Sequence, residues 1–283
     1  MTSPPVTDTT ATRTPLGESS ESATLAPTGS LCPNQNVLLA ACPNRLHAGL
    51  WPHFNQIEVK YGQVLHTPTG SQPYVWFPVT AQISLNSLLE DGSCAEFASV
   101  GSDGMVGIEA LFGNHKPPGV AMVIADGIAW RVPCTAVRQA FEQDAAWREV
   151  LLRYAQGLIV QIGQTAVCNR HHTVEQQFFR ILLSGLDRAP GCEIRITHEG
   201  LSHRLGFRRE TISEVASKAR LAGLIDYRRG RIAVLDRARM ERLTCECYRL
   251  MRQEVTIPPQ PRPATPWCGA SQCQHCRGPT SGC

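Results

Sequence analysis

The sequence predicts an α+β protein: an antiparallel β-roll comes first, a long helix follows, and two short helices with a β-hairpin come last. Short apolar or alternating runs separated by glycines fill residues 57–133. A helical apolar repeat runs through residues 135–169, and two amphipathic segments precede a hairpin pattern in residues 197–235. The predicted parts are an N-terminal segment at 1–34, a β-roll at 35–134, a long helix at 135–172, a helix-and-hairpin domain at 173–252 and a cysteine-rich tail at 253–283.

Length and composition limit the number of domains and the kind of protein that these parts can form. The chain has 283 residues, enough for about two domains, and 42% hydrophobic residues can supply a sizeable core. Residues 1–34 are rich in Thr, Ser and Pro and have little periodic apolar content, so we expect this segment to be disordered. No apolar run is long enough to cross a membrane, and the N-terminus has no secretory-signal pattern. We therefore expect a cytoplasmic protein.

The β-roll follows from the spacing of its candidate strands. Residues 35–54 look helical and short. Beyond them, six runs have the length and composition of strands, at residues 63–66, 74–77, 82–85, 94–97, 120–124 and 128–132. Many short strands at nearly regular spacing are typical of an antiparallel β-roll or barrel.

A long helical stretch is predicted from Thr135 to Asn169. Six of its residues follow alternating spacings of four and three, which is the heptad pattern of two helices packed along their length: Leu151, Ala155, Leu158, Ile162, Thr165 and Asn169. This seam has two interpretations, because the helix could pack against a partner helix in a homodimer or against its own β-roll. A further helix is predicted from Val174 to Leu186.

Residues 197–221 have the pattern of two short helices joined by a tight turn. The first helix has Leu201 and Leu205 on one face and Thr197 as a candidate N-cap. Gly206 can adopt the left-handed backbone conformation that such a turn needs. In the second helix, small and apolar residues recur at spacings of three and four, at Ile212, Val215, Ala216 and Ala219. Two strand-like runs, at 223–227 and 232–235, then flank an arginine-rich turn.

This winged helix-turn-helix pattern carries the positive charge of the chain. Residues 195–231 hold nine basic and four acidic residues, a net charge of +5, whereas the whole chain has +3 and residues 51–146 have −5. A local basic surface is typical of phosphate binding, so we expect double-stranded DNA as a partner. Two long helices paired in a homodimer would hold two such domains about one DNA turn apart, which favours the dimer. The candidate DNA-binding residues are Arg208, Arg209, Glu210, Thr211, Ser213 and Glu214 on the second helix and Arg228, Arg229 and Arg231 on the hairpin.

The order of these parts, over residues 36–250, resembles the Crp/Fnr superfamily of bacterial transcription regulators. The most specific segments are Arg209-Glu210-Thr211, Gly223-Leu224-Ile225, Asn169-Arg170-His171 and Cys245-Glu246-Cys247-Tyr248. The resemblance implies a β-roll of the jelly-roll type that binds cyclic nucleotides in relatives. It also implies a homodimer on a near-palindromic site, contact with RNA polymerase, and a G·C pair read by Arg209 and Glu210.

The chain departs from the family pattern in both domains. Many relatives have an arginine where Glu214 stands, and Arg208 occupies a position that often holds a capping Ser or Thr. Relatives that bind cyclic AMP have an arginine for the cyclic phosphate, yet residues 117–121 of this chain read Pro-Pro-Gly-Val-Ala. Because an anion buried without a cation is costly, we expect no binding of cyclic AMP in the family manner. The sequence does not identify another effector.

Twelve cysteines raise the question of a metal. Eight lie in the body of the chain, mostly among apolar neighbours, and we expect most of them to be buried reduced thiols. The other four have the spacing of metal ligands, at Cys268, Cys273, Cys276 and Cys283. This set could hold zinc or an iron–sulfur cluster, or it could be a tail of reduced thiols. A regulator that senses redox state or metal through this tail is the alternative function.

An enzyme is the remote alternative. A β-roll also resembles cupins, whose metal site needs a His-x-His pair, a nearby carboxylate and a later His. The β-roll here offers only His53, His66 and His115, without that pairing, and His171-His172 lies at a helix end. We therefore predict that the protein is not an enzyme.

Overall fold

The computed structural model describes residues 33–90, 94–113, 116–188 and 193–254. All of the described residues belong to one unit of the chain, Leu31–Cys283. The predicted segment 1–34 and the tail from residue 255 onward lie outside the described residues, apart from residues 33 and 34. None of the described helices is long and apolar enough to span a membrane.

Short helices precede the sheets, as the sequence predicts. They are the 3-10 turns Pro33–Gln35 and Trp51–His53 and the α-helices α1 (Val37–Ala40) and α2 (Asn44–Leu50). Asn36 is fully buried and anchors this segment. Its side-chain oxygen accepts hydrogen bonds from the first turn of α1, and its Nδ2 donates to the carbonyl oxygens of Pro78 and Gly104, both at 2.8 Å. One capping residue therefore ties α1 to two points of the β-roll.

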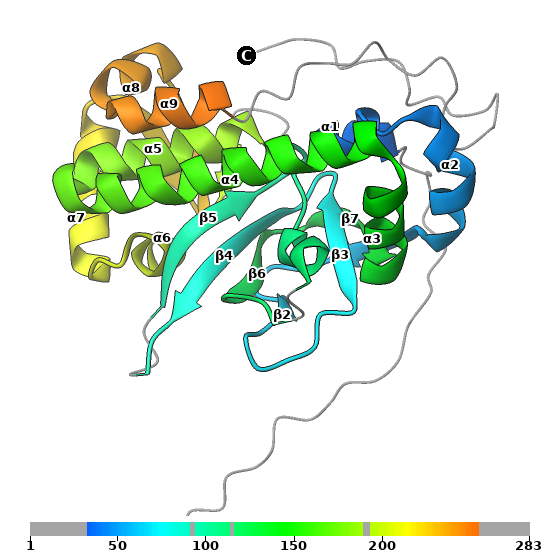
Figure 1. The fold of residues 1–283 in the computed structure, drawn as a ribbon. Helices are drawn as coiled ribbons and strands as arrows, with labels where there is room; N and C mark the ends of the chain where they lie inside the picture. The colour runs from blue at the N-terminus through cyan, green and yellow to red at the C-terminus, as the bar shows by residue number, and fades with distance from the viewer. Residues whose placement is uncertain (1–32, 91–93, 114–115, 189–192, 255–283) are drawn as a thin grey trace, which may run out of the picture. The chain divides into compact units, whose positions relative to one another are not determined.

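The β-roll consists of two antiparallel sheets (Figure 1). The strands are β1 (Asn55–Val59), β2 (Val64–His66), β3 (Tyr74–Pro78), β4 (Gln82–Leu88), β5 (Cys94–Val100), β6 (Val120–Ala125) and β7 (Gly127–Pro133). They pair in the orders β1-β7-β3 and β2-β6-β4-β5. All six predicted runs form strands, and β1 is the strand that the sequence did not single out. This architecture confirms the predicted fold class.

Helices α3 (Cys134–Gln143) and α4 (Ala145–His171) follow, with a break between them at Asp144. The sequence predicts one continuous helical stretch here, which is wrong at this residue. Asp144 has extended backbone angles, and its carboxylate accepts a hydrogen bond from the Trp147 amide at 3.0 Å, so it caps α4. Arg45, far away in the sequence, donates two hydrogen bonds to the same carboxylate at 2.5 and 2.8 Å. The N-cap and this long-range partner together explain the break.

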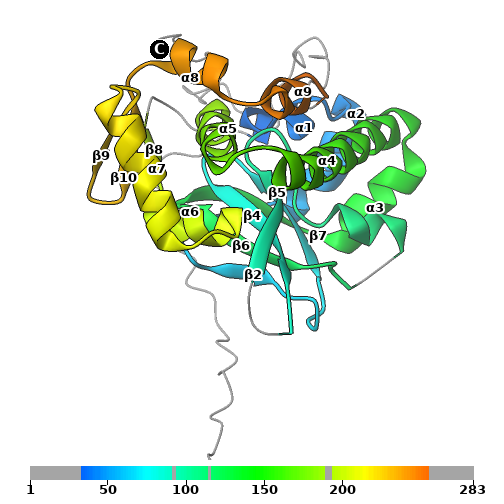
Figure 2. The same cartoon turned by 90° about the vertical axis from the view of Figure 1, so that its left-hand side faces the viewer.

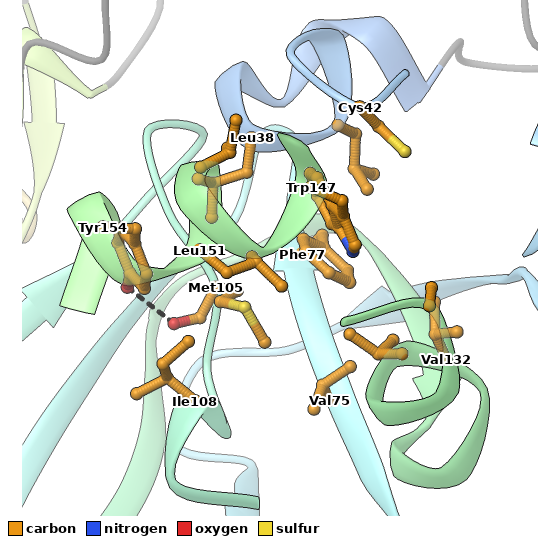
Figure 3. Packing of buried hydrophobic residues seen from close by; sticks show 14 of the residues in the cluster. Leu38, Cys42, Val75, Phe77, Met105, Ile108, Val132, Trp147, Leu151 and Tyr154 are labelled. Carbon is orange, nitrogen blue, oxygen red and sulfur yellow. Dashed lines mark hydrogen bonds between the residues drawn. The ribbon is translucent and has the colours of Figure 1, made fainter. Parts of the chain in front are cut away.

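The main hydrophobic core lies between α4 and the β-roll (Figure 3). Trp147 and Leu151 point from α4 towards Phe77 of β3, and the Tyr154 hydroxyl donates to the Met105 carbonyl at 2.6 Å. Leu151 is fully buried, and Ala155 and Thr165 are less than 9% exposed. These three belong to the predicted heptad seam, so much of that seam is buried within the protein's own fold rather than free for a partner chain.

The C-terminal domain has its own core around Phe178, Phe179 and Leu182 of α5 (Val174–Asp187). Helices α6 (His198–Leu205) and α7 (Arg209–Leu221) pack against each other, and a three-stranded sheet lies beside them (Figure 2). The sheet order is β8-β10-β9, with β8 at Glu193–Arg195, β9 at Ile225–Arg228 and β10 at Arg231–Val234. Helices α8 (Arg237–Leu243) and α9 (Glu246–Glu254) end the described part of the chain.

Candidate DNA-binding surface

The turn between α6 and α7 has the geometry that its residues predict. The Thr197 hydroxyl accepts a hydrogen bond from the Gly200 amide at 2.9 Å and caps α6. Gly206 ends α6 with a φ of 70°, a left-handed conformation that costs glycine little. The Ser202 hydroxyl donates to the Phe207 carbonyl and closes the turn. These contacts set the direction in which α7 begins.

The start of α7 presents charged side chains that have no partner. Arg208 is the N-cap residue, and its side chain makes no capping hydrogen bond. Arg208, Arg209 and Glu210 are all exposed. Within the part of the chain that the structure describes, none of the three forms an ion pair or side-chain hydrogen bond. Their hydrogen-bonding groups are therefore available to an external ligand.

The next turn of α7 is already engaged within the protein. The Ser213 hydroxyl lies 3.0 Å from Nδ1 of His198, and the His198 ring stacks on Tyr227 of β9 with centroids 4.5 Å apart. Burial, and then the charge of Arg209, lower the pKa of His198. His198 thus connects α6, α7 and the hairpin, a role that the sequence analysis missed. Thr211 is half-buried, and Glu214 pairs with Lys218 at 2.8 Å on an exposed helix face.

The β9–β10 hairpin carries one arginine that differs from its neighbours. Arg228 pairs with Asp226 at 2.9 Å, and Arg231 lies 3.5 Å from Glu193. Arg229 at the tip has a φ of 49°, and Gly230 follows with 77°. Two successive positive φ angles are typical of a type I′ hairpin turn. A non-glycine residue in this conformation costs about 1 kcal/mol, which the hairpin must offset. The turn holds the Arg229 side chain at the tip of the wing.

Arg204 is a basic residue of this domain that does not contribute to the exposed surface. It lies in α6 with only 7% of its side chain exposed, and it forms two hydrogen bonds, at 2.6 and 2.9 Å, with Glu96 of β5. Glu96 is equally buried and also accepts from the Ser84 hydroxyl at 2.5 Å. The charge of Arg204 is therefore neutralised within the protein, and its inclusion in the basic surface overstated that surface by one charge.

A small cavity of the β-roll is lined by Pro118, Gly119 and Val120, which belong to the segment 117–121 that lacks an arginine. Its volume is about 20 Å³, and Gly107, Glu109 and His66 also lie on its wall. A volume of this size has room for about one water molecule. Burial raises the pKa of Glu109 and lowers that of His66 to about 4. No arginine or lysine is among the lining residues of this cavity.

The other candidate residues lie apart from this surface. The tail set Cys268, Cys273, Cys276 and Cys283 is outside the described residues, as is His115. His53 is exposed and His66 is buried, and they belong to no cluster of metal-ligand side chains within the described ranges. Five of the six body cysteines that the structure describes are buried, which fits the expectation for them.

Comparisons with known proteins agree with the geometry of the C-terminal domain. Residues 176–243 match the family model of the Crp-like helix-turn-helix domain. No curated protein matches the chain in sequence.

Solved structures with this fold include three transcriptional regulators. A protein described as a Crp/Fnr-family transcriptional regulator from Eubacterium rectale has a TM-score of 0.59 and 17% identity, covering 74% of this chain and 98% of that chain. FixK2 from Bradyrhizobium japonicum has a TM-score of 0.58 and 17% identity over 68% of this chain and 98% of its own. A CRP-family transcriptional regulator from Thermus thermophilus has a TM-score of 0.57 and 18% identity over 66% of this chain and 95% of its own.

Proposed function

We propose that this chain, a regulator of Crp/Fnr type with a Crp-like helix-turn-helix domain, binds a near-palindromic DNA site as a homodimer and thereby controls transcription. The observation that carries the proposal is the unpartnered group of Arg208, Arg209 and Glu210 at the exposed start of α7. The first turn of a recognition helix is the part that contacts base edges in the major groove.

The residues of this surface divide by the contacts that they can make. Arg209 can donate to both acceptors of a guanine, and Glu210 can accept from the cytosine amine, so the two can read one G·C pair. Arg208 and Arg229 have no acidic partner among the described residues, and we assign them to phosphates. Thr211, Ser213, Glu214, Arg228 and Arg231 already have internal contacts or partial burial, so we expect a smaller share of the DNA contacts from them.

A second apolar face of α4 supports the homodimer. Leu152 is 46% exposed, Ile159 69% and Val167 47%, although all three are aliphatic. Leu152, Ile159, Gly163 and Ala166 follow a heptad spacing, with Val167 beside them, on the side of α4 that does not face the β-roll. A Cβ added at Gly163 would meet nothing within 4 Å, so a partner helix has room to approach there. The proposed dimer seam is therefore this face, offset by about one residue from the one that the sequence suggested.

The effector, the location and the other partners are proposed on the same basis. The small cavity of the β-roll and its lack of a cation favour a regulator that does not respond to cyclic AMP. We propose a cytoplasmic location, contact with RNA polymerase and no catalytic role, because these accompany a regulator of this type. Zinc or an iron–sulfur cluster at the tail cysteines stays a proposal, testable by metal analysis with and without serine at those four positions.

Two arginine substitutions test the DNA surface. A binding site is first selected from fragments of genomic DNA and then measured by fluorescence anisotropy over a range of salt concentrations. Arg209→Ala is expected to weaken this site by about 1–3 kcal/mol and to relax the preference at one base pair. Arg229→Ala is expected to weaken all sequences alike and to reduce the salt slope by about one unit. Arg138→Ala, an exposed arginine of α3, is the control. Unchanged binding in both variants would show that another element enters the groove.

The dimer seam has a separate test. Ile159→Glu places a charge in the middle of the proposed interface and is expected to yield monomers in sedimentation equilibrium. Leu89→Glu is the matched control, because Leu89 is 59% exposed and lies outside α4. A dimer that survives the Ile159 change would contradict this seam.

A further inference from the structure

Four potential metal ligands meet at the junction between α4 and α9. Cys168 lies in the last turn of α4 and His172 directly follows that helix, whereas Cys245 and Cys247 flank the start of α9. Their ligand atoms all lie within 4.8 Å of one another. Cys168 Sγ lies 3.6 Å from Cys245 Sγ, and Cys247 Sγ lies 3.6 Å from His172 Nδ1. Residues about 75 positions apart in the sequence thus converge on one point.

We infer that Cys168, His172, Cys245 and Cys247 form a tetrahedral site for a single zinc-type divalent ion. Zinc bonds of about 2.3 Å to sulfur and 2.0–2.1 Å to nitrogen place neighbouring ligands roughly 3.5–3.8 Å apart in a tetrahedron. The Cys168–Cys245 and Cys247–His172 pairs already have this separation. A multinuclear cluster would hold some of its ligands farther apart, so the spacing favours one ion.

The orientation of His172 supports the site independently. Its Nδ1 faces the Cys247 sulfur, and its Nε2 lies 3.3 Å from a carboxylate oxygen of Glu246. Histidines that bind metals almost always donate their other ring N–H to such an oxygen, which sets the tautomer and the ring orientation. The Gln177 amide also donates to the His172 carbonyl at 3.0 Å and holds the backbone. The ring is therefore oriented with its free nitrogen towards the thiols.

The charges around the site also balance. Three thiolates, a neutral imidazole and a divalent ion carry a net charge of −1. Arg180 of α5 is only 6% exposed, and its Nε has no hydrogen-bond partner among the described residues. Its positive charge interacts electrostatically with the Cys168 thiol. A buried guanidinium beside three buried thiols is costly unless the thiols carry negative charge.

The place of the site suggests what the ion does. Helix α4 contributes both the core of the β-roll and the proposed dimer seam, whereas α9 packs on α4 and α5 at the base of the DNA-binding domain. An ion that joins the end of α4 to the start of α9 would fix the angle between these parts. This consequence rests on the proposed function, whereas the metal binding itself does not.

The test uses the full chain with serine at the four tail cysteines, so that only the body thiols remain. This protein is expected to bind one equivalent of Co²⁺ with the thiolate charge-transfer and tetrahedral d–d bands of a cysteine-rich site, and Zn²⁺ is expected to displace it. Cys247→Ser is expected to abolish these bands, and Glu246→Gln to weaken the metal affinity about 10–100-fold. The controls His171→Gln and Cys94→Ser change an exposed neighbour of the site and a thiol outside it, and both are expected to bind normally.

X-ray absorption of the zinc-loaded protein identifies the ligands of the ion without any substitution within the site. It therefore tests the inference even if Cys247→Ser does not fold. Three sulfurs and one nitrogen around the ion are expected. The inference is overturned if Co²⁺ shows no thiolate bands, if the bands persist in Cys247→Ser, or if absorption shows only oxygen and nitrogen ligands. DNA affinity is measured with and without the bound metal. If the protein binds metal but its DNA affinity does not change, only the role of the ion in fixing the angle between α4 and α9 is overturned. If the metal-free protein binds DNA, the proposed function is unaffected.

Discussion

The buried ion pair between Arg204 and Glu96 makes a quantitative prediction, because it joins the first helix of the DNA-binding domain to strand β5. Each side chain is less than 9% exposed, and two hydrogen bonds connect them. Arg204→Met leaves the Glu96 carboxylate buried with the Ser84 hydroxyl as its donor. Removal of one partner from such a pair costs about 3–5 kcal/mol, because the other charge stays buried and unpaired.

The double substitution distinguishes this cause from a simple loss of packing. Glu96→Leu with Arg204→Met replaces the ion pair by two apolar side chains of similar size, which is often neutral or stabilising. We therefore expect each single variant to lose about 3 kcal/mol or more in the free energy of unfolding and the double variant to lose far less than their sum. At about 2–4 °C per kcal/mol for a chain of this size, each single variant would melt roughly 6–12 °C lower.

Urea unfolding followed by circular dichroism measures these free energies. The exposed pair Arg138–Glu142 of α3 is the control, since its loss is expected to cost at most about 0.5 kcal/mol. Additive losses in the double variant, or single losses as small as those of the control, would refute the reasoning.

Two further predictions concern the β-roll. Asn36→Ala removes the cap of α1 and two buried donors, so we expect a loss of about 2–3 kcal/mol in urea unfolding; a loss no larger than that of an exposed Asn would contradict the anchoring role. Burial lowers the pKa of His66 to about 4, whereas the pKa of histidine in the unfolded chain is 6.5. The unfolded chain therefore binds a proton more readily than the folded one, so the stability that neutral His66 preserves above pH 6.5 is lost as the pH falls towards 4. His66→Gln is expected to flatten the decline in stability over that range, by at most about 3 kcal/mol, and parallel pH profiles of the two proteins would rule the effect out.

Features that depend on neighbouring residues could be predicted from the sequence alone. Most strands of the β-roll, the turn at Gly206, the start of α7 at Arg209 and the hairpin follow from spacings of two, three or four residues and from a few glycines. The charge pattern also identified α7 and the hairpin as the candidate DNA surface. The predictions of local structure succeeded because steric and hydrogen-bonding preferences act over a single turn of helix or a single pair of residues in a strand, whereas the DNA contacts stay a prediction.

Features that depend on distant residues needed the tertiary structure. The break at Asp144 is held by Arg45, and Arg204 is neutralised by Glu96, more than 90 residues away in each case. Helix α4 has two apolar faces, one with Leu151 and one with Ile159, and periodicity cannot say which of them the β-roll covers. The convergence of Cys168 and His172 with Cys245 and Cys247 is of the same kind. Local preferences determine which elements form, whereas only the packing of those elements decides which side chains meet, because burial and ion pairing depend on every segment that reaches the same place.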